Sequence, residues 1–221
     1  MTDHTPQTQP YPADIPGVAT PAGPFRALLP VVLASGSPRR REFLHSLGLP
    51  FEVYGNGAAE PEPRPSEAPS AYARRAAAAK AASVAATRPG CVVIAADTVV
   101  ALHGEIMGKP RDRMDAVRML SRLAGHTHDV VSACCVALPD GSSEIFHAVT
   151  RVTMWDVPTT ALAAYAATGE PDDKAGAYGI QGVGAFLVES IAGSWSNVVG
   201  LPVAELVRLL LHHGCIEPAG E

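Results

Sequence analysis

The sequence predicts an α/β protein in which a mixed sheet extends through two lobes that flank a cleft. Three observations lead to this prediction. Short apolar runs alternate with helical segments in the first half of the chain, as they do in α/β proteins. Two longer strand-like segments follow, joined at Asp140-Gly141, a strong hairpin signal that adds antiparallel strands. The 221 residues are 47% apolar and 18% charged, which is enough to bury a core.

The first predicted elements are a strand, a helix and a second strand. Residues 28–33 form a short apolar run that is typical of a buried strand. Ser37 precedes Pro38, which predicts a helix start because serine is a good N-cap and proline needs no hydrogen bond at the first helical position. We expect this helix to end at Gly48. Residues 51–54 then predict another strand.

A proline-rich loop comes next in the sequence. Ser66 follows it and is the expected N-cap of a long Ala-rich helix. Residues 91–96 are an apolar run that predicts a buried strand, and this strand runs directly into Asp97 and Thr98. Asp97 is therefore expected at the carboxyl end of its strand.

The second half of the chain carries the hairpins. His103-Gly104 predicts a tight turn, and Asp112 is a candidate N-cap for a helix over residues 113–123. The remaining predicted elements are strands over residues 129–138, 144–155 and 185–191, a helix capped by Thr159 that ends near residue 168, and a final helix that opens at Pro202.

Composition excludes several classes of protein. The net charge of -5 argues against a general nucleic-acid binder, although a few converging cations can still bind a small polyanion. The four cysteines form no CxxC pair and no zinc-ligand spacing, so we expect buried thiols in a reducing compartment. No run reaches the roughly 20 apolar residues that span a bilayer. We expect a cytoplasmic protein without a membrane partner.

The chain is expected to hold one domain between two tails. The first residues are rich in Pro and Thr and carry no Lys or Arg before Arg26, unlike a secretory signal. We predict a disordered tail over residues 1–26, a domain over residues 27–214 and a short tail over residues 215–221.

The sequence Ala-Ser-Gly-Ser-Pro-Arg-Arg at residues 34–40 lies between a buried strand and a helix start. A helix N-terminus favours phosphate, and the hydroxyls of Ser35 and Ser37 and the guanidinium groups of Arg39 and Arg40 add donors and charge. The alternative interpretation is an ordinary N-cap with solvated arginines.

Asp97 ends an apolar run, which predicts a place at the carboxyl edge of the sheet, where open α/β folds bind ligands. The alternative is a strand-terminal Asp that caps a turn.

Two loops carry further candidate residues. Lys109 lies in a loop past the predicted hairpin; alone it is typical of a solvated surface lysine, and it is a candidate only if it lies beside the other groups. In the loop over residues 172–182, Lys174 brings charge and Gln181 could read a base edge with one donor and one acceptor. This loop could also be a flexible connector. Neither a GxGxxG fingerprint nor a GxxxxGK[ST] phosphate loop fits the chain.

Together these segments resemble the Maf family of nucleoside triphosphate pyrophosphatases. The matching pieces are LASGSPRRREFL at residues 33–44, AADTVVALHGEIMGKPRD at 95–112, DKAGAYGIQG at 173–182 and GSWSNVVGLP at 193–202. The resemblance implies an elongated, two-lobed fold with a twisted mixed sheet like that of inosine triphosphatases, and a homodimer. It also implies that water attacks between the α and β phosphates with the help of Mg²⁺ or Mn²⁺, which yields a nucleoside monophosphate and pyrophosphate.

The resemblance also assigns roles to residues. It implies that Asp97 accepts the proton from water and that Glu60 lines the cleft, and we expect Glu60 to share the metal ion with Asp97. The loop DKAGAYGIQG is similar to that of the subgroup that prefers dTTP and UTP. The residues implied to bind the substrate are Arg39, Thr98 and Gln181 at specificity positions, and Ser35, Arg40, Lys80, Lys109 and Lys174 elsewhere in the cleft. We expect Ser37, at the helix start, to bind phosphate beside them.

Two other functions stay open. One is a nucleotide-sensing regulator of septum formation that binds without turnover. The other is a house-cleaning pyrophosphatase that acts on modified nucleotides.

Overall fold

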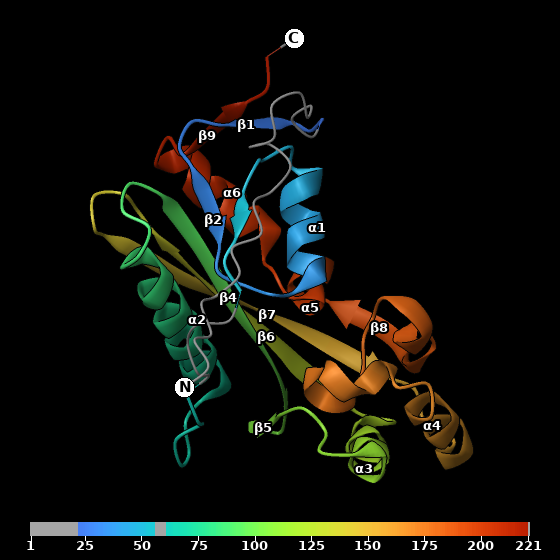
Figure 1. The fold of residues 1–221 in the computed structure, drawn as a ribbon. Helices are drawn as coiled ribbons and strands as arrows, with labels where there is room; N and C mark the ends of the chain where they lie inside the picture. The colour runs from blue at the N-terminus through green and yellow to red at the C-terminus, as the bar shows by residue number, and fades with distance from the viewer. Residues whose placement is uncertain (1–21, 56–60, 221) are drawn as a thin grey trace, which may run out of the picture.

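The centre of the molecule is a seven-stranded mixed sheet, which confirms the predicted α/β fold. The structure is a computed structural model that describes residues 22–55 and 61–220. The strand order is β3-β2-β4-β6-β7-β8, with β5 beside β4 (Figure 1). The strands of this sheet are β2 (Val31–Leu33), β3 (Glu52–Val53), β4 (Val92–Leu102), β5 (Glu105–Met107), β6 (Thr127–Ala137), β7 (Ser143–Met154) and β8 (Val188–Ala192).

Helices cover both faces of this sheet. The α-helices are α1 (Pro38–Ser46), α2 (Pro69–Ala85), α3 (Arg113–Leu123), α4 (Thr159–Ala166), α5 (Trp195–Val199) and α6 (Val203–His212). Three short 3₁₀ helices lie between α4 and β8, namely η2 (Glu170–Asp173), η3 (Ala175–Ala177) and η4 (Gly182–Leu187).

Side-chain alternation along β4 divides the core into three parts. Val93, Ala95 and Val99 point to one face and pack under α2. On the other face, Ile94 packs with residues of α1 and α6, whereas Val100 packs with residues of α3 and α4. The long strands thus connect two separate cores, one at each end, while α2 lies along their other face (Figure 1). These two cores form the predicted lobes.

One edge of β4 is interrupted, and this opening positions the site. Strand β6 pairs with β4 continuously, from Val93 to Ala101. The opposite edge is shared by β2, which pairs parallel with Val92–Ile94, and β5, which pairs antiparallel with Val100–Leu102. Between these two ladders, none of the described strands runs along residues 95–99.

The structure corrects the predicted end of the strand over residues 91–96. Strand β4 continues to Leu102, so Asp97 is the sixth of its eleven residues. The backbone stays extended because β6 pairs with it throughout this stretch. Asp97 nevertheless lies beyond the end of β2, and so at the carboxyl edge of the parallel pair.

Three other predicted boundaries are wrong. Ser66 does not cap the Ala-rich helix, since α2 begins at Pro69, whose ring fixes a helical φ. Thr159 is the first residue of α4 and not its cap. The strand predicted from residue 185 begins at Val188, because the residues before it form η4.

Other local predictions are confirmed. Asp112 caps α3 by accepting the N–H of Asp115 at 2.7 Å. The His103-Gly104 turn connects β4 to β5, and Asp140-Gly141 lies in the turn between β6 and β7. All four cysteines are free thiols, and three of them are buried. No described helix is long and apolar enough to cross a membrane.

Segments near the two ends of the described residues pair in a separate small sheet. Strand β1 (Phe25–Ala27) pairs antiparallel with β9 (Ile216–Pro218) (Figure 1). The described parts of both predicted tails therefore contain strand structure that the sequence did not suggest. Residues 1–21 and residue 221 lie outside the described residues, so the domain boundaries stay a prediction.

Candidate active site

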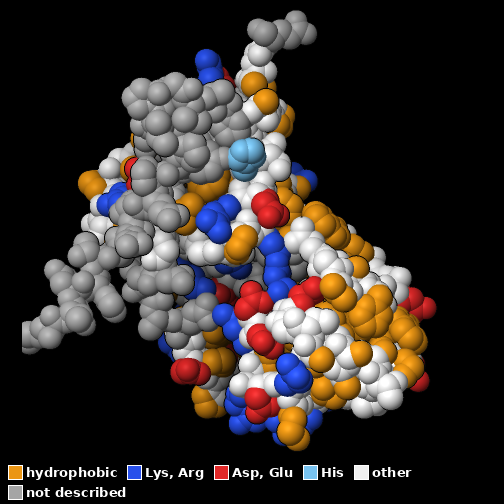
Figure 2. Space-filling view, turned by 45° about the vertical axis from the view of Figure 1, so that its right-hand side comes forward, with side chains coloured by type: hydrophobic (Ala, Val, Ile, Leu, Met, Phe, Trp, Pro, Cys, Tyr) orange, Lys and Arg blue, Asp and Glu red, His pale blue; other side chains and the backbone are white. Residues whose placement is uncertain are grey.

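A pocket of about 750 Å³ lies at the opening in the edge of β4. Figure 2 shows Lys and Arg side chains beside Asp and Glu side chains around the middle of this face. The structure brings almost all of the predicted site residues to this pocket. Those that line it are Ser35, Ser37, Arg39, Arg40, Lys80, Asp97, Thr98, Lys109, Lys174 and Gln181. Glu60 lies outside the described residues.

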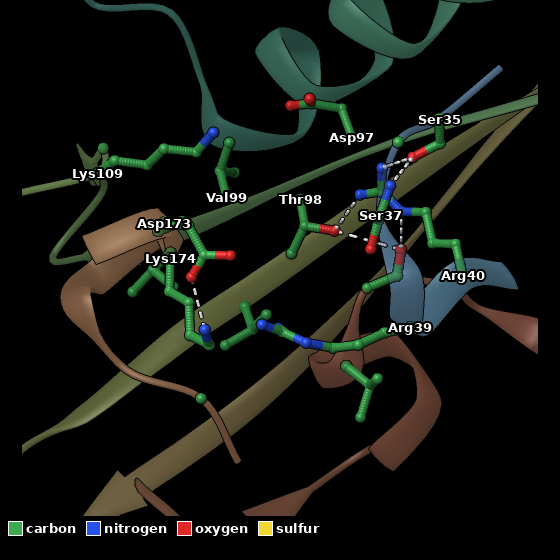
Figure 3. Close-up of a pocket in the computed structure, with 18 of the residues that line it drawn as sticks. Ser35, Ser37, Arg39, Arg40, Asp97, Thr98, Val99, Lys109, Asp173 and Lys174 are labelled. Carbon is green, nitrogen blue, oxygen red and sulfur yellow. Dashed lines mark hydrogen bonds and ion pairs between the residues drawn. The ribbon is translucent and has the colours of Figure 1, made fainter. Parts of the chain in front are cut away.

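Side chains from both faces of the sheet reach this one pocket. Successive residues of a strand point to opposite faces, so Asp97 points toward α2 and Thr98 toward α1. Both line the pocket because it opens on the strand edge that β2 and β5 leave uncovered. Figure 3 shows Asp97 near α2 and Thr98 near Arg40.

Arg40, in the first turn of α1, is held on three sides. Its Nη1 donates to Ser35 Oγ at 3.0 Å and its Nη2 to Thr98 Oγ1 at 3.1 Å. Its Nε donates to the carbonyl oxygen of Gly200 at 2.9 Å. Three acceptors in a fixed arrangement suit the planar guanidinium and fix its orientation in the pocket (Figure 3).

The start of α1 differs in one detail from the prediction. Ser37 occupies the N-cap position, but its side chain makes no capping hydrogen bond. The N–H of Ser37 instead donates to Ser35 Oγ at 3.2 Å. Ser35 thus links the backbone at the helix start to Arg40.

Helix α2 supplies the partner of Asp97. Lys80 Nζ lies 2.7 Å from Asp97 Oδ1, and their side chains are 17% and 9% exposed. An ammonium group this close favours the ionised carboxylate, which is the form that can accept a proton. Lys80 therefore contacts the candidate base directly, in addition to lining the pocket.

The loop between α4 and β8 closes the pocket on the far side. Lys174 Nζ contacts Asp173 Oδ1 at 2.6 Å and the carbonyl oxygen of Glu170 at 2.9 Å. The hydrogen bond from Lys174 lowers the pKa of the Asp173 carboxyl. Gly176 has a φ of 70°, and a Cβ there would lie 2.9 Å from a methyl carbon of Val100. A glycine is required at this position for the loop to pack directly on β4.

Three residues near the pocket were not predicted. Asp173 lines it, and its place beside Lys174 in a charged loop was the available signal. Glu170 accepts hydrogen bonds from the Tyr165 hydroxyl and from the N–H groups of Val183 and Gly184, each at 3.0 Å. Its position before the loop gave no signal of this role.

His128 is the third such residue. Its Nε2 lies 2.7 Å from the hydroxyl of Tyr178, which lines the pocket. Burial lowers the pKa of His128 to about 4. Near neutral pH the imidazole is therefore uncharged, and it supports the loop without adding charge to the pocket.

Cations dominate this pocket although the whole chain is acidic. Among its described lining residues, five carry a cationic side chain and three a carboxylate. Figure 3 shows Lys109 and Arg39 approaching the middle of the pocket from opposite sides. Converging guanidinium and ammonium groups around a carboxylate suit a bound polyphosphate whose hydrolysis needs a base.

Residues 30–213 match the model of the family described as Maf-like protein. The chain belongs to the Maf family. A dTTP/UTP pyrophosphatase of Nitratidesulfovibrio vulgaris is 64% identical over 197 residues, which cover 89% of this chain and 94% of that protein. One from Oleidesulfovibrio alaskensis is 60% identical over 90% of this chain and 91% of its own length.

Two similar solved structures are more distant in sequence from this Maf protein. The Ham1 protein of Staphylococcus aureus has a TM-score of 0.48 and 14% identity, with 83% of this chain and 98% of that chain covered. A dITP/XTP pyrophosphatase from Mycobacterium abscessus has a TM-score of 0.39 and 16% identity, with coverage of 84% and 94%.

Proposed function

We propose that this Maf protein hydrolyses dTTP and UTP to the nucleoside monophosphate and pyrophosphate. The observation that carries the proposal is a single pocket in which Asp97, Arg40 and Lys109 come together from three different segments. The names of the similar proteins, dTTP/UTP pyrophosphatases, support the choice of substrate.

Binding of the triphosphate rests on the cations. Negative charge builds on the bridging oxygen and on the departing pyrophosphate, and fixed cations stabilise it without reorganising. We assign this role to Arg39, Arg40 and Lys109, with Ser35 and Ser37 beside them. Lys174 adds positive charge from the opposite loop.

Asp97 takes the proton from the attacking water. It is 6% exposed, and its contact with Lys80 holds the carboxylate in place for the attacking water. The Lys80 ammonium then remains close enough to stabilise phosphate oxygens next to the reacting water.

The pocket also fits a divalent metal ion. Mg²⁺ is commonly held by one or two carboxylates together with phosphate oxygens of the substrate, and Asp97 offers its carboxylate beside the phosphate-binding cations. Within residues 22–55 and 61–220, no group of three His, Cys, Asp or Glu side chains forms a ready-made metal site. Asp97 and Glu60 would hold the ion, which supplies positive charge to the phosphate oxygens.

Base selectivity rests on Gln181, with Arg39 and Thr98. A glutamine amide can pair with the carbonyl and N–H groups at the edge of thymine or uracil. We expect kcat/KM to be higher for dTTP and UTP than for dATP, dCTP or GTP.

A substrate panel tests the function. Pyrophosphate release is measured for these five nucleotides and for nucleoside triphosphates with modified bases, with Mg²⁺, with Mn²⁺ and with a chelator, which should abolish turnover. Equal rates for all bases would refute the preference, and faster turnover of modified nucleotides would favour a house-cleaning role. Binding without turnover under every condition would refute hydrolysis and favour a regulator of septum formation.

We further propose a cytoplasmic homodimer. The four free cysteines suit a reducing compartment. Exposed large apolar side chains, including Trp155, Val183 and Phe186, offer surface for a second copy. Light scattering coupled to size-exclusion chromatography tests the dimer directly, and a monomeric mass would refute it.

A further inference from the structure

The segment GSWSNVVG at residues 193–200 ends at the pocket, which Gly200 helps to line. Asn197 of α5 is fully buried, and both ends of its amide make hydrogen bonds. Its Oδ1 accepts the N–H of Ser132 at 3.1 Å, and its Nδ2 donates to the carbonyl of Val130 at 3.0 Å and to Thr150 Oγ1 at 2.9 Å. These contacts fix α5 against β6 and β7.

Ser132 connects α5 to the pocket. It is fully buried, and its Oγ donates to the carbonyl oxygen of Asn197 at 2.8 Å. A carbonyl oxygen only accepts, so this bond uses the one proton of the Ser132 hydroxyl. Thr98 Oγ1 also lies 2.8 Å from Ser132 Oγ. Thr98 must therefore be the donor in that second bond.

The opposite direction of this chain is less favourable. If Ser132 donated to Thr98, the proton of Thr98 could reach only the Gly200 carbonyl among its described neighbours, at 3.4 Å. That distance lies outside the normal range for a hydroxyl donor, which ends near 3.0 Å. The buried Asn197 carbonyl would also lose the bond from Ser132.

Because its proton is used in the bond to Ser132, the Thr98 hydroxyl can only accept hydrogen bonds from groups in the pocket. Its acceptor faces Arg40 Nη2, a group that can only donate. We propose that Ser132 and Asn197 are positioning residues, which fix the Thr98 hydroxyl as an acceptor and through it hold Arg40 in the orientation that binds the triphosphate. This inference rests on the proposed function.

Gly200, at the end of the same segment, completes the arrangement. Its carbonyl accepts Arg40 Nε at 2.9 Å, and its φ of 128° is one that other residues rarely adopt. One short segment therefore sets two of the three acceptors around Arg40, directly through Gly200 and indirectly through Asn197 and Ser132.

A double-mutant cycle tests the inference. Ser132→Ala, Thr98→Val and the double variant are compared with the wild type for kcat and KM with dTTP. We expect each single substitution to lower kcat/KM about 3- to 10-fold, mainly through KM, because one buried hydrogen bond is lost. If Ser132 acts through Thr98, adding Ser132→Ala to Thr98→Val should have no further effect.

Two controls accompany the cycle. Ser132→Thr keeps a hydroxyl at this position and should restore most of the lost kcat/KM. Thr127→Ala removes an exposed hydroxyl from the same strand, outside the pocket lining, and should leave kcat/KM unchanged. If Ser132→Ala does not fold, Ser132→Cys replaces it, since a thiol fills a similar volume but accepts hydrogen bonds weakly.

The outcomes separate this inference from the proposed function. Wild-type kcat/KM in Ser132→Ala, or losses that multiply in the double variant, would overturn the positioning role while hydrolysis stands. A wild-type protein that releases no pyrophosphate would overturn the proposed function and this inference with it. Both are supported if the losses of kcat/KM in Ser132→Ala and Thr98→Val do not multiply in the double variant and Ser132→Thr keeps most of the wild-type kcat/KM.

Discussion

Arg40 shows how the predicted site residues depend on one another. The sequence suggested Ser35 and Thr98 as separate substrate contacts, whereas both hydroxyls accept hydrogen bonds from Arg40. Lys80 was predicted to bind phosphate and also pairs with Asp97. Part of the pocket could be predicted from residue chemistry, because cations, hydroxyls and a carboxylate suit phosphate, whereas Lys80 and Thr98 were assigned through the resemblance to the family. The partners of these residues could not be predicted, because these contacts join residues up to 160 positions apart.

We predict that Arg40→Lys lowers kcat/KM for dTTP by about tenfold or more. Lysine keeps the charge, but its single ammonium cannot reproduce the planar fork that reaches three acceptors. Steady-state kinetics give the measurement. Arg41→Lys, at the adjacent position outside the pocket lining, is the matched control and should behave like the wild type. Equal kcat/KM in both variants would contradict the role of Arg40.

The elements were easiest to predict where a local signal and a long-range contact agree. The Asp140-Gly141 turn fits the twist of two long paired strands, and Asp112 caps α3 through its own side chain. Strand β4 was predicted too short because Asp97 looked like a strand end. Its continuation depends on pairing with β6, a contact that no local window of sequence contains. The 3₁₀ helices also escaped prediction, since tertiary packing stabilises them.

The Glu170 carboxylate accepts hydrogen bonds from both α4 and η4, and the stability that these bonds give should depend on pH. Desolvation raises the pKa of Glu170, but hydrogen bonds from Gly184, Val183 and Tyr165 outweigh it and hold the pKa below its ordinary value. A depressed carboxyl pKa gives stability that is present above the unfolded pKa near 4.5 and lost as pH falls through the folded pKa.

We therefore predict that Glu170→Gln lowers the free energy of unfolding at pH 7 by about 0.5–1.5 kcal/mol, because one partly buried acceptor oxygen is replaced by an amide group that cannot accept. This difference from the wild type should shrink below pH 4. Urea unfolding at several pH values measures it. Glu189→Gln, an exposed position in β8, is the control and should cost little. A difference for Glu170→Gln that stays constant down to pH 3 would count against the role of the carboxylate.

At the scale of the whole molecule, the opening in the edge of β4 makes the site possible. Strands β2 and β5 pair with different ends of one edge, so Asp97 and Thr98 reach the same pocket from opposite faces. Helices α1 and α2 and the loops that carry Lys109 and Lys174 then place cations around it, although the chain carries a net charge of -5. The sequence predicted the fold class from alternating strands and helices. It could not predict this opening, which depends on where two unconnected strands stop.

The central claim is that these surrounding cations bind a polyphosphate while Asp97 activates water. The most direct measurement is pyrophosphate release from dTTP by Asp97→Asn, with unfolding by urea to show that the variant is folded. We predict a folded protein that still binds dTTP and whose kcat falls about 10²- to 10⁴-fold, the usual loss when a general base is removed. A folded Asp97→Asn variant with near-native kcat would contradict the claim.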